Sequence, residues 1–370
     1  MNPATLPVRG TTDLYADRPL TKLTAHQRIG FELGWDYAHY RLSPLSAHLA
    51  EPSVLRDGLA AGQAVFGLRT LAASRWVRKW LQLRLNAWLR GRSVELLQVT
   101  PHYLQQIDTS HCPITRLALS TATLEPGDAS IDRVRNDAGY AAGNLATMSA
   151  RANRAKGAHG RSQALQFASR IEDQRLGAVD GLSAAQWERV AALCSFVEPL
   201  PHHVACTLPL VLLPPNRLRL FNPVQALQAF VSRQLLTPGW SARIGRFEAL
   251  LAGKPLRRAF QSFFYAFLPR VLEAGRTADP LQARWAVEDA WGNPLVLRRW
   301  SEFAVQLDAD RCQRLLLRAH AKRLGSQRID TFDEVQSTDG WNLASRGYVP
   351  PASDDAPAPQ QQPWQESLPL

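Results

Sequence analysis

The sequence predicts a mainly α-helical protein with one small α+β element and a disordered C-terminal tail. Apolar residues recur at helical spacing through residues 23–105 and again from about 183 to 330. Residues 130–156 instead combine short β-compatible runs, Asn-Asp-Gly turn residues and then helix formers. We therefore expect an irregular arm at 1–22, a helical N-terminal region at 23–105, a hairpin-and-helix element at 106–160, a helical domain at 161–345 and a Pro-, Gln- and Ala-rich disordered tail at 346–370.

Length and charge narrow the classes of function. With 370 residues, 45% of them hydrophobic and 20% charged, the chain resembles an ordinary globular protein of two or so domains. The formal net charge of +11 favours a polyanionic partner, with nucleic acid before an acidic membrane surface. An arginine- and alanine-rich coding bias would give the same charge, so both explanations stay open.

The cysteines indicate whether the protein holds a structural zinc ion, and the apolar runs indicate whether it enters or crosses a membrane. Cys112, Cys194, Cys206 and Cys312 lie far apart with no CxxC pair, so we expect reduced thiols and no structural zinc. The first residues do not resemble a signal peptide, and no apolar run approaches the roughly 20 residues of a membrane span. A cytoplasmic protein without a membrane partner is the expectation.

The N-terminal helices have a clear start and an uncertain break. Thr24 is a candidate N-cap for a first helix. A long helical tract then runs over residues 53–92, with a break expected near Gly58, Gly62 or Gly67.

Arginines and tryptophans alternate in the second half of that tract. Trp76 and Trp80 share a helix face, which favours a place in the core. Arg75, Arg78 and Lys79 belong either to a solvated face or to a face laid along a phosphate backbone. A second basic tract comprises Arg311, Arg314, Arg318, Lys322 and Arg323.

The C-terminal half indicates helices around an aromatic core. Ser183 is a candidate N-cap, and the proline-broken apolar run at 208–215 suggests a buried connection. Aromatic residues over 260–268 form a core stripe, and further core or inter-helix contacts are expected at Trp285, Trp291 and Trp300.

The stretch from 130 to 156 carries the polar residues of greatest chemical interest. Residues 130–134 are strand-compatible, 135–139 form a turn, 140–147 can return as a second strand, and 148–156 favour a helix. A hairpin followed by a helix can bring Asp132 and Asn153 together. A carboxylate and an amide oxygen suit a hard cation such as Mg²⁺.

These residues resemble a known motif. Asp132-Arg133-Val134, Gly139, Asn144-Leu145, Asn153 and Lys156 look like the HNH (ββα-metal) nuclease motif, in its histidine-lacking Ser-Ile-Asp-Arg variant. The upstream Cys112-Pro113-Ile114-Thr115 resembles the Cys-Pro-hydrophobic-Thr that often precedes it. The resemblance covers about residues 110–157 and implies an endonuclease that uses Mg²⁺ or Mn²⁺ on DNA rather than RNA.

The resemblance also implies roles for single residues. Asp132 and Asn153 match the metal ligands, and Asn144 matches the asparagine that holds the turn and orients the base. Lys156, with Arg154 or Arg151, would contact phosphate.

Arg133 is the departure from the family pattern, because it stands at the position of the general-base histidine. An arginine stays protonated and cannot take a proton from water, although it can clamp a phosphate or brace Asp132. Three outcomes follow. The base comes from His111, His159 or Tyr140; metal-bound water acts without a protein base; or the module binds nucleic acid without cutting it. A helical scaffold protein with no nucleic-acid partner is the remaining alternative.

Overall fold

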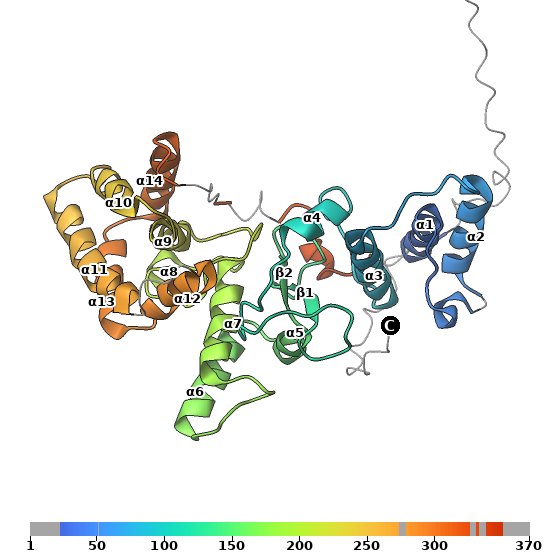
Figure 1. Cartoon of the computed structure of the whole chain (residues 1–370), viewed down its shortest axis with the longest axis horizontal. Helices are drawn as coiled ribbons and strands as arrows, with labels where there is room; N and C mark the ends of the chain where they lie inside the picture. Colours follow the sequence, from blue (N-terminus) through green and yellow to red (C-terminus); the bar gives the residue numbers. More distant parts are fainter. Residues whose placement is uncertain (1–22, 51, 274–278, 326–330, 333–337, 351–370) are drawn as a thin grey trace, which may run out of the picture. The chain divides into compact units, whose positions relative to one another are not determined.

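The structure is a computed structural model, described here for residues 23–50, 52–273, 279–325, 331–332 and 338–350. The predicted arm at 1–22 and residues 351–370 of the predicted tail lie outside the described residues. The fold is mainly helical with a two-stranded antiparallel sheet (Figure 1). It comprises two compact units, one running up to Gly91 and joined by residues from Val349, the other running from Arg92 to Tyr348. None of the helices described is long and apolar enough to cross a bilayer.

The first unit is a small helical bundle with its own core. It consists of α1 (Ala25–His39), the 3₁₀ turn η2 (Ser46–Leu49), α2 (Val54–Phe66) and α3 (Arg75–Leu89). Thr24 caps α1 as predicted, since its hydroxyl accepts from Gln27 N and the Gln27 side chain accepts from Thr24 N. Leu33, Leu55 and Leu81 are fully buried at the centre of this bundle.

Glycines bring the backbones of α1 and α2 into direct contact. A Cβ on Gly34 would lie 2.0 Å from Leu55 O, and a Cβ on Gly58 would lie 1.9 Å from Phe31 O. Of the three candidate positions for the predicted break, Gly58 and Gly62 lie inside α2 at this interface, so neither of them ends the helix. The helix ends instead at Gly67, whose positive φ of 52° suits a residue without a side chain.

The tryptophans of α3 do not fill the core in the way the sequence predicts. Trp76 and Trp80 are half-buried at the side of the bundle, beneath the guanidinium groups of Arg75 and Arg84. Arg84 is itself buried and forms an ion pair with Asp36. Leucines take the inward face of the helix, and Trp80 packs against this core as a partly buried side chain.

The second unit contains the sheet and all later helices. Its strands are β1 (Ala129–Arg133) and β2 (Leu145–Ser149). Its helices are α4 (Pro101–Gln106), α5 (Ala150–Lys156), α6 (Arg161–Asp173), α7 (Ala184–Phe196), α8 (His202–Ala205), α9 (Pro223–Gln234), α10 (Trp240–Glu248), α11 (Lys254–Glu273), α12 (Pro280–Ala290), α13 (Pro294–Ala304), α14 (Ala309–Ala321) and the 3₁₀ turn η3 (Leu343–Ser345).

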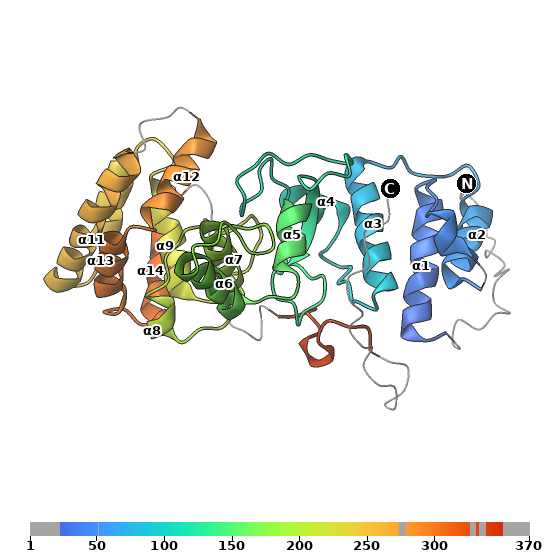
Figure 2. The ribbon, with the colours of Figure 1, turned by 90° about the horizontal axis from the view of Figure 1, so that it is seen from below.

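The hairpin and the later helices of this unit share one continuous hydrophobic core, which extends from Cys112 to Trp341. Helices α6 and α7 pair beside the hairpin, and α11 packs on α13 (Figures 1 and 2). Trp291 and Trp300 are fully buried against the α11 phenylalanines, as predicted, whereas Trp285 is half-buried between His111 and Arg116. The apolar run at 208–215 is a non-helical connection with buried leucines.

The chain returns to the hairpin loop after α14. Trp341 is fully buried; its carbonyl accepts from Gly139 N at 2.8 Å and its indole N–H donates to Ala142 O at 3.1 Å. Gly347 O accepts from Ser93 N at 2.9 Å. The first residues of the predicted tail, up to Tyr348, therefore belong to the second unit. The first unit runs up to Gly91, and residues 92–105 of the predicted N-terminal region belong to the second unit.

We expect Gly34→Ala to destabilise the first unit by about 2–3 kcal/mol, because the added methyl group would overlap the Leu55 carbonyl and force α1 and α2 apart. Gly245→Ala on α10 is the matched control, since no atom lies within 4 Å of its Cβ position and alanine favours helix by about 1 kcal/mol. Scanning calorimetry of the full chain measures both. Equal melting profiles for the two variants would contradict the close contact.

Candidate functional site

The predicted ββα arrangement is present. β1 pairs antiparallel with β2 in the register Ala129↔Ser149 to Arg133↔Leu145, and α5 follows at once. Ser149 caps α5 by accepting from Ala152 N at 3.2 Å. The second strand is shorter than the predicted 140–147, and the helix starts at Ala150 rather than at 148. Residues 140–144 form a loop instead, in which Gly143 has a φ of 86°.

Asn144 holds that loop closed, as the resemblance implies. Its side-chain oxygen accepts from Arg135 N at 2.8 Å, while its amide group donates to Arg135 O and Gly139 O, both at 3.1 Å. The residue is fully buried, so these bonds replace the water that its amide loses. Its role is therefore to fix the backbone that links the two strands.

Lys156 is completely buried rather than exposed to phosphate. Its ammonium lies 2.9 Å from Asp132 Oδ2, and it donates to Arg133 O at 2.9 Å and to Asn136 Oδ1 at 3.3 Å. The three oxygens come from β1 and from the turn that follows it. The predicted contact of Lys156 with nucleic acid is wrong, because the side chain has no accessible surface.

Asp132 lies in the same interior. It is 5% exposed, and burial raises the pKa of its carboxyl, against which the Lys156 ammonium and the Arg133 guanidinium act. The ion pair with Lys156 is close, but Oδ2 has no aligned hydrogen bond. The ion pair and the hydrogen bond from Lys156 to Arg133 O together link α5 to this strand.

Asn153 and Asp132 face the same side of the hairpin, and each contacts a different side chain. The Asn153 amide donates to Ser130 Oγ at 2.7 Å, and Ser130 and Asp132 occupy alternate positions of β1 that both meet α5. Sequence reasoning missed Ser130 and Asn136 as members of this cluster. The period of the strand could have indicated Ser130, but Asn136 read only as a turn residue.

These donors do not fit a divalent ion in the arrangement seen. The carboxylate that would bind Mg²⁺ or Mn²⁺ is engaged by an ammonium, and the Asn153 amide is engaged by a hydroxyl. Over the described part of the chain, no three His, Cys, Asp or Glu side chains gather where they could hold a metal ion. No chemical step through a metal follows from this geometry.

Arg133 braces the loop. Its guanidinium donates to Asn136 O at 3.2 Å and to Ala138 O at 2.8 Å, and lies 5.2 Å from the centre of the Tyr140 ring. The predicted alternatives were a phosphate clamp or a brace for Asp132. Its hydrogen bonds instead hold the backbone of the turn.

The candidate bases lie in separate surroundings. His111 contacts Ser110 Oγ at 3.0 Å and meets the Trp285 ring edge-on, while His159 packs edge-on against Phe167 and Trp187. Tyr140 faces Arg133, as noted above. No hydrogen bond or ring contact among the described residues joins any of the three directly to Asp132.

The predicted phosphate contacts differ in their exposure. Arg151 and Arg154 are exposed on α5, and the Arg151 guanidinium donates to Gly181 O. Arg75 and Arg78 are exposed on α3 of the first unit, where Lys79 is half-buried. Arg311, Arg314 and Arg318 share the exposed face of α14.

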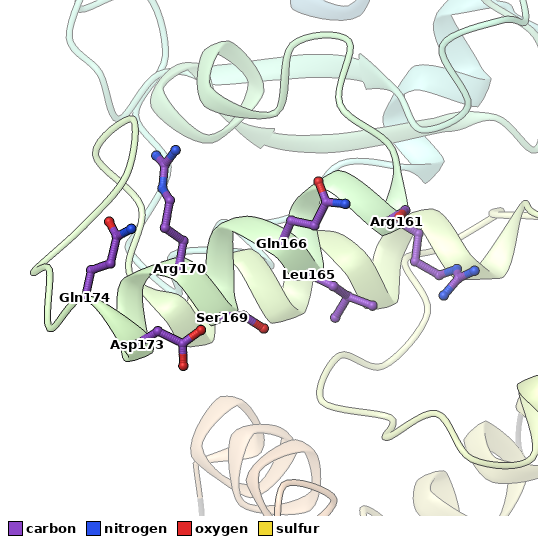
Figure 3. Close-up of a pocket in the computed structure, with 8 residues that line it drawn as sticks. Arg161, Leu165, Gln166, Ser169, Arg170, Asp173 and Gln174 are labelled. Carbon is purple, nitrogen blue, oxygen red and sulfur yellow. The ribbon is translucent and has the colours of Figure 1, made fainter.

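A shallow hollow lies along α6, next to this region in sequence. Figure 3 shows Gln166 and Arg170 leaving the helix on one side, and Leu165 and Asp173 on the other. Its lining residues come from α6 and its C-cap Gln174, and none belongs to the motif. It is a helix surface and not a closed active-site cleft.

No protein-family model, curated protein or solved structure matches the chain. The resemblance to HNH proteins therefore depends on the motif residues and their spacing.

We expect Asn144→Ala to destabilise the second unit by about 3 kcal/mol, because three backbone groups in a buried loop would lose their partner. Asn86→Ala, at an exposed position of α3, is the control and should change stability by less than about 0.5 kcal/mol. Chemical denaturation measures both. An Asn144 variant as stable as the control would rule out this role.

We expect the stability of the loop before β1 to fall in acid, because the loop is held by hydrogen bonds to the Asp128 carboxylate. Although burial acts to raise the pKa of its carboxyl, bonds from Thr123, Ser120 and Leu124 N lower it below the ordinary 3.8. A lowered pKa stabilises the fold above the unfolded value, and this stability is lost as the pH falls through the folded pKa. Asp128→Asn should therefore cost about 1 kcal/mol at pH 7 and progressively less below pH 4. A difference in melting temperature that is the same at both pH values would contradict this assignment.

Proposed function

We propose that residues 106–160 form an HNH-like module that binds nucleic acid, and that the module binds the phosphate backbone without cutting it. The observation that carries this proposal is the engagement of both expected metal ligands by protein groups. Asp132 pairs with Lys156, and Asn153 pairs with Ser130. A module whose expected metal ligands already contact other side chains keeps the ββα shape but has few ligands free for a catalytic ion.

The charge of the chain supports an anionic partner. The net charge is +11 and the isoelectric point is about 10.0. Arg151 and Arg154 are exposed on α5, and arginine forms forked bonds to phosphate oxygens. DNA is preferred to RNA by the resemblance alone.

A divalent-metal-dependent DNA endonuclease is the second candidate. The observation in its favour is that Asp132 and Asn153 meet α5 from the same face of the hairpin, with Asp132 Oδ2 lacking an aligned hydrogen bond. Cleavage by this route requires Lys156 to release the carboxylate. It also requires a proton acceptor other than Arg133.

Binding is tested with the full chain and labelled duplex DNA, single-stranded DNA and duplex RNA between 50 and 300 mM salt. We expect duplex binding whose affinity falls steeply with salt, because phosphate contacts release counterions. Arg154→Glu should weaken it about tenfold, whereas Arg258→Glu, an exposed arginine of α11, is the matched charge control. No binding at 50 mM salt would leave the scaffold alternative.

Cutting is tested on supercoiled plasmid with Mg²⁺ or Mn²⁺. We expect no nicking by the wild-type protein. Nicking that disappears in both Asp132→Ala and Asn153→Ala would establish the endonuclease instead. Nicking that survives both would point to a contaminant or another site, and the binding measurements would then decide the proposed function alone.

A further inference from the structure

Lys156 carries the unusual feature of the ββα unit, a fully buried primary ammonium. It is among the largest side chains in the chain with no accessible surface. Moving such a charge out of water costs several kcal/mol unless oxygens surround it in good geometry. A site that holds it must therefore be built for a positive charge.

The surrounding oxygens form such a site. The carboxylate of Asp132, the carbonyl of Arg133 and the side-chain oxygen of Asn136 lie 2.9, 2.9 and 3.3 Å from Nζ. Carboxylate, carbonyl and amide oxygens are also the usual ligands of hard cations. The distances are those of ammonium hydrogen bonds, and exceed the roughly 2.0–2.1 Å that Mg²⁺ requires.

We propose that the Lys156 ammonium is a built-in cation that takes the place of a divalent ion in this ββα unit. The hairpin and α5 then pack together without any metal, and the Asp132 carboxylate binds the Lys156 ammonium in place of an ion. This inference rests on the proposed function and deepens it. It gives a reason why the ββα unit would bind nucleic acid without cutting it.

The position of Lys156 in the fold allows its ammonium to take the place of an ion between β1 and α5. It stands at the end of α5, one helical turn after Asn153, so its side chain meets β1 beside the Asn153–Ser130 bond. Asn136, which it contacts, also donates to His159 O at 3.4 Å. The ammonium thus joins β1 to the following turn, and Asn136 joins that turn to the chain beyond α5.

The wild-type protein provides a first test that needs no variant. Its melting temperature should be the same, within about 1 °C, in EDTA and in 5 mM Mg²⁺ or Mn²⁺. Mn²⁺ titrated into the protein should retain the electron paramagnetic resonance signal of the free ion. A stabilising shift, or loss of the signal at one equivalent that Asp132→Asn abolishes, would overturn the proposal.

A mutant cycle provides the second test. Lys156→Met and Asp132→Asn should each lower the melting temperature by about 10 °C, since each leaves the other charge buried alone. The double variant should recover at least half of the summed loss. Lys254→Met, at an exposed position of α11, is the control. Strictly additive losses would overturn the proposal.

The two tests are independent of nucleic acid. A protein that binds DNA but takes up Mn²⁺ at Asp132 refutes the built-in cation and leaves the proposed module in place. If the losses of melting temperature at Lys156 and Asp132 are coupled but the protein does not bind DNA, the built-in cation is supported and the proposed function is refuted. If Lys156→Met fails to fold, the Mn²⁺ titration of the wild type still decides.

Discussion

The second unit depends on a buried charge that cannot be left unpaired. The ammonium of Lys156 and the carboxylate of Asp132 lie 2.9 Å apart within a hydrophobic surround, and removing either would strand the other. Such a pair adds little net stability, since both charges have lost water. Its effect is local, because it places the end of α5 against β1 at Asp132.

Hydrogen bonds from several other segments of the chain also hold the loop between the two strands. Tyr103 Oη accepts from Gly143 N at 2.8 Å, and the carbonyl of Gly143 accepts from Arg219 N at 3.1 Å. Residues 92–95 and 341–347 cover the same loop by backbone bonds. Segments from both ends of the unit therefore converge on the hairpin, and the ββα element packs into the larger core of this unit.

The sequence predicted those elements whose structure depends mainly on residues close together in the chain. The capped start at Thr24, the hairpin and the short helix after it follow from residue types and spacing alone. Gly58 and Gly62 misled because a glycine that permits close helix contact reads the same as one that ends a helix. The burial of Lys156 and the return of Trp341 to the hairpin depend on distant partners, which no local pattern reveals.

The same point bears on what the motif means. Asn144 closes the loop, Lys156 and Asp132 fix the helix on the strand, Asn153 bonds to Ser130, and Arg133 holds the turn by two carbonyls. Each motif residue thus has a folding role that would keep it in place with no reaction to perform. Motif order and spacing then identify a ββα shape, whereas cleavage requires groups left free for an ion and a proton. In this arrangement those groups are occupied, so the step from shape to catalysis has to be shown by experiment.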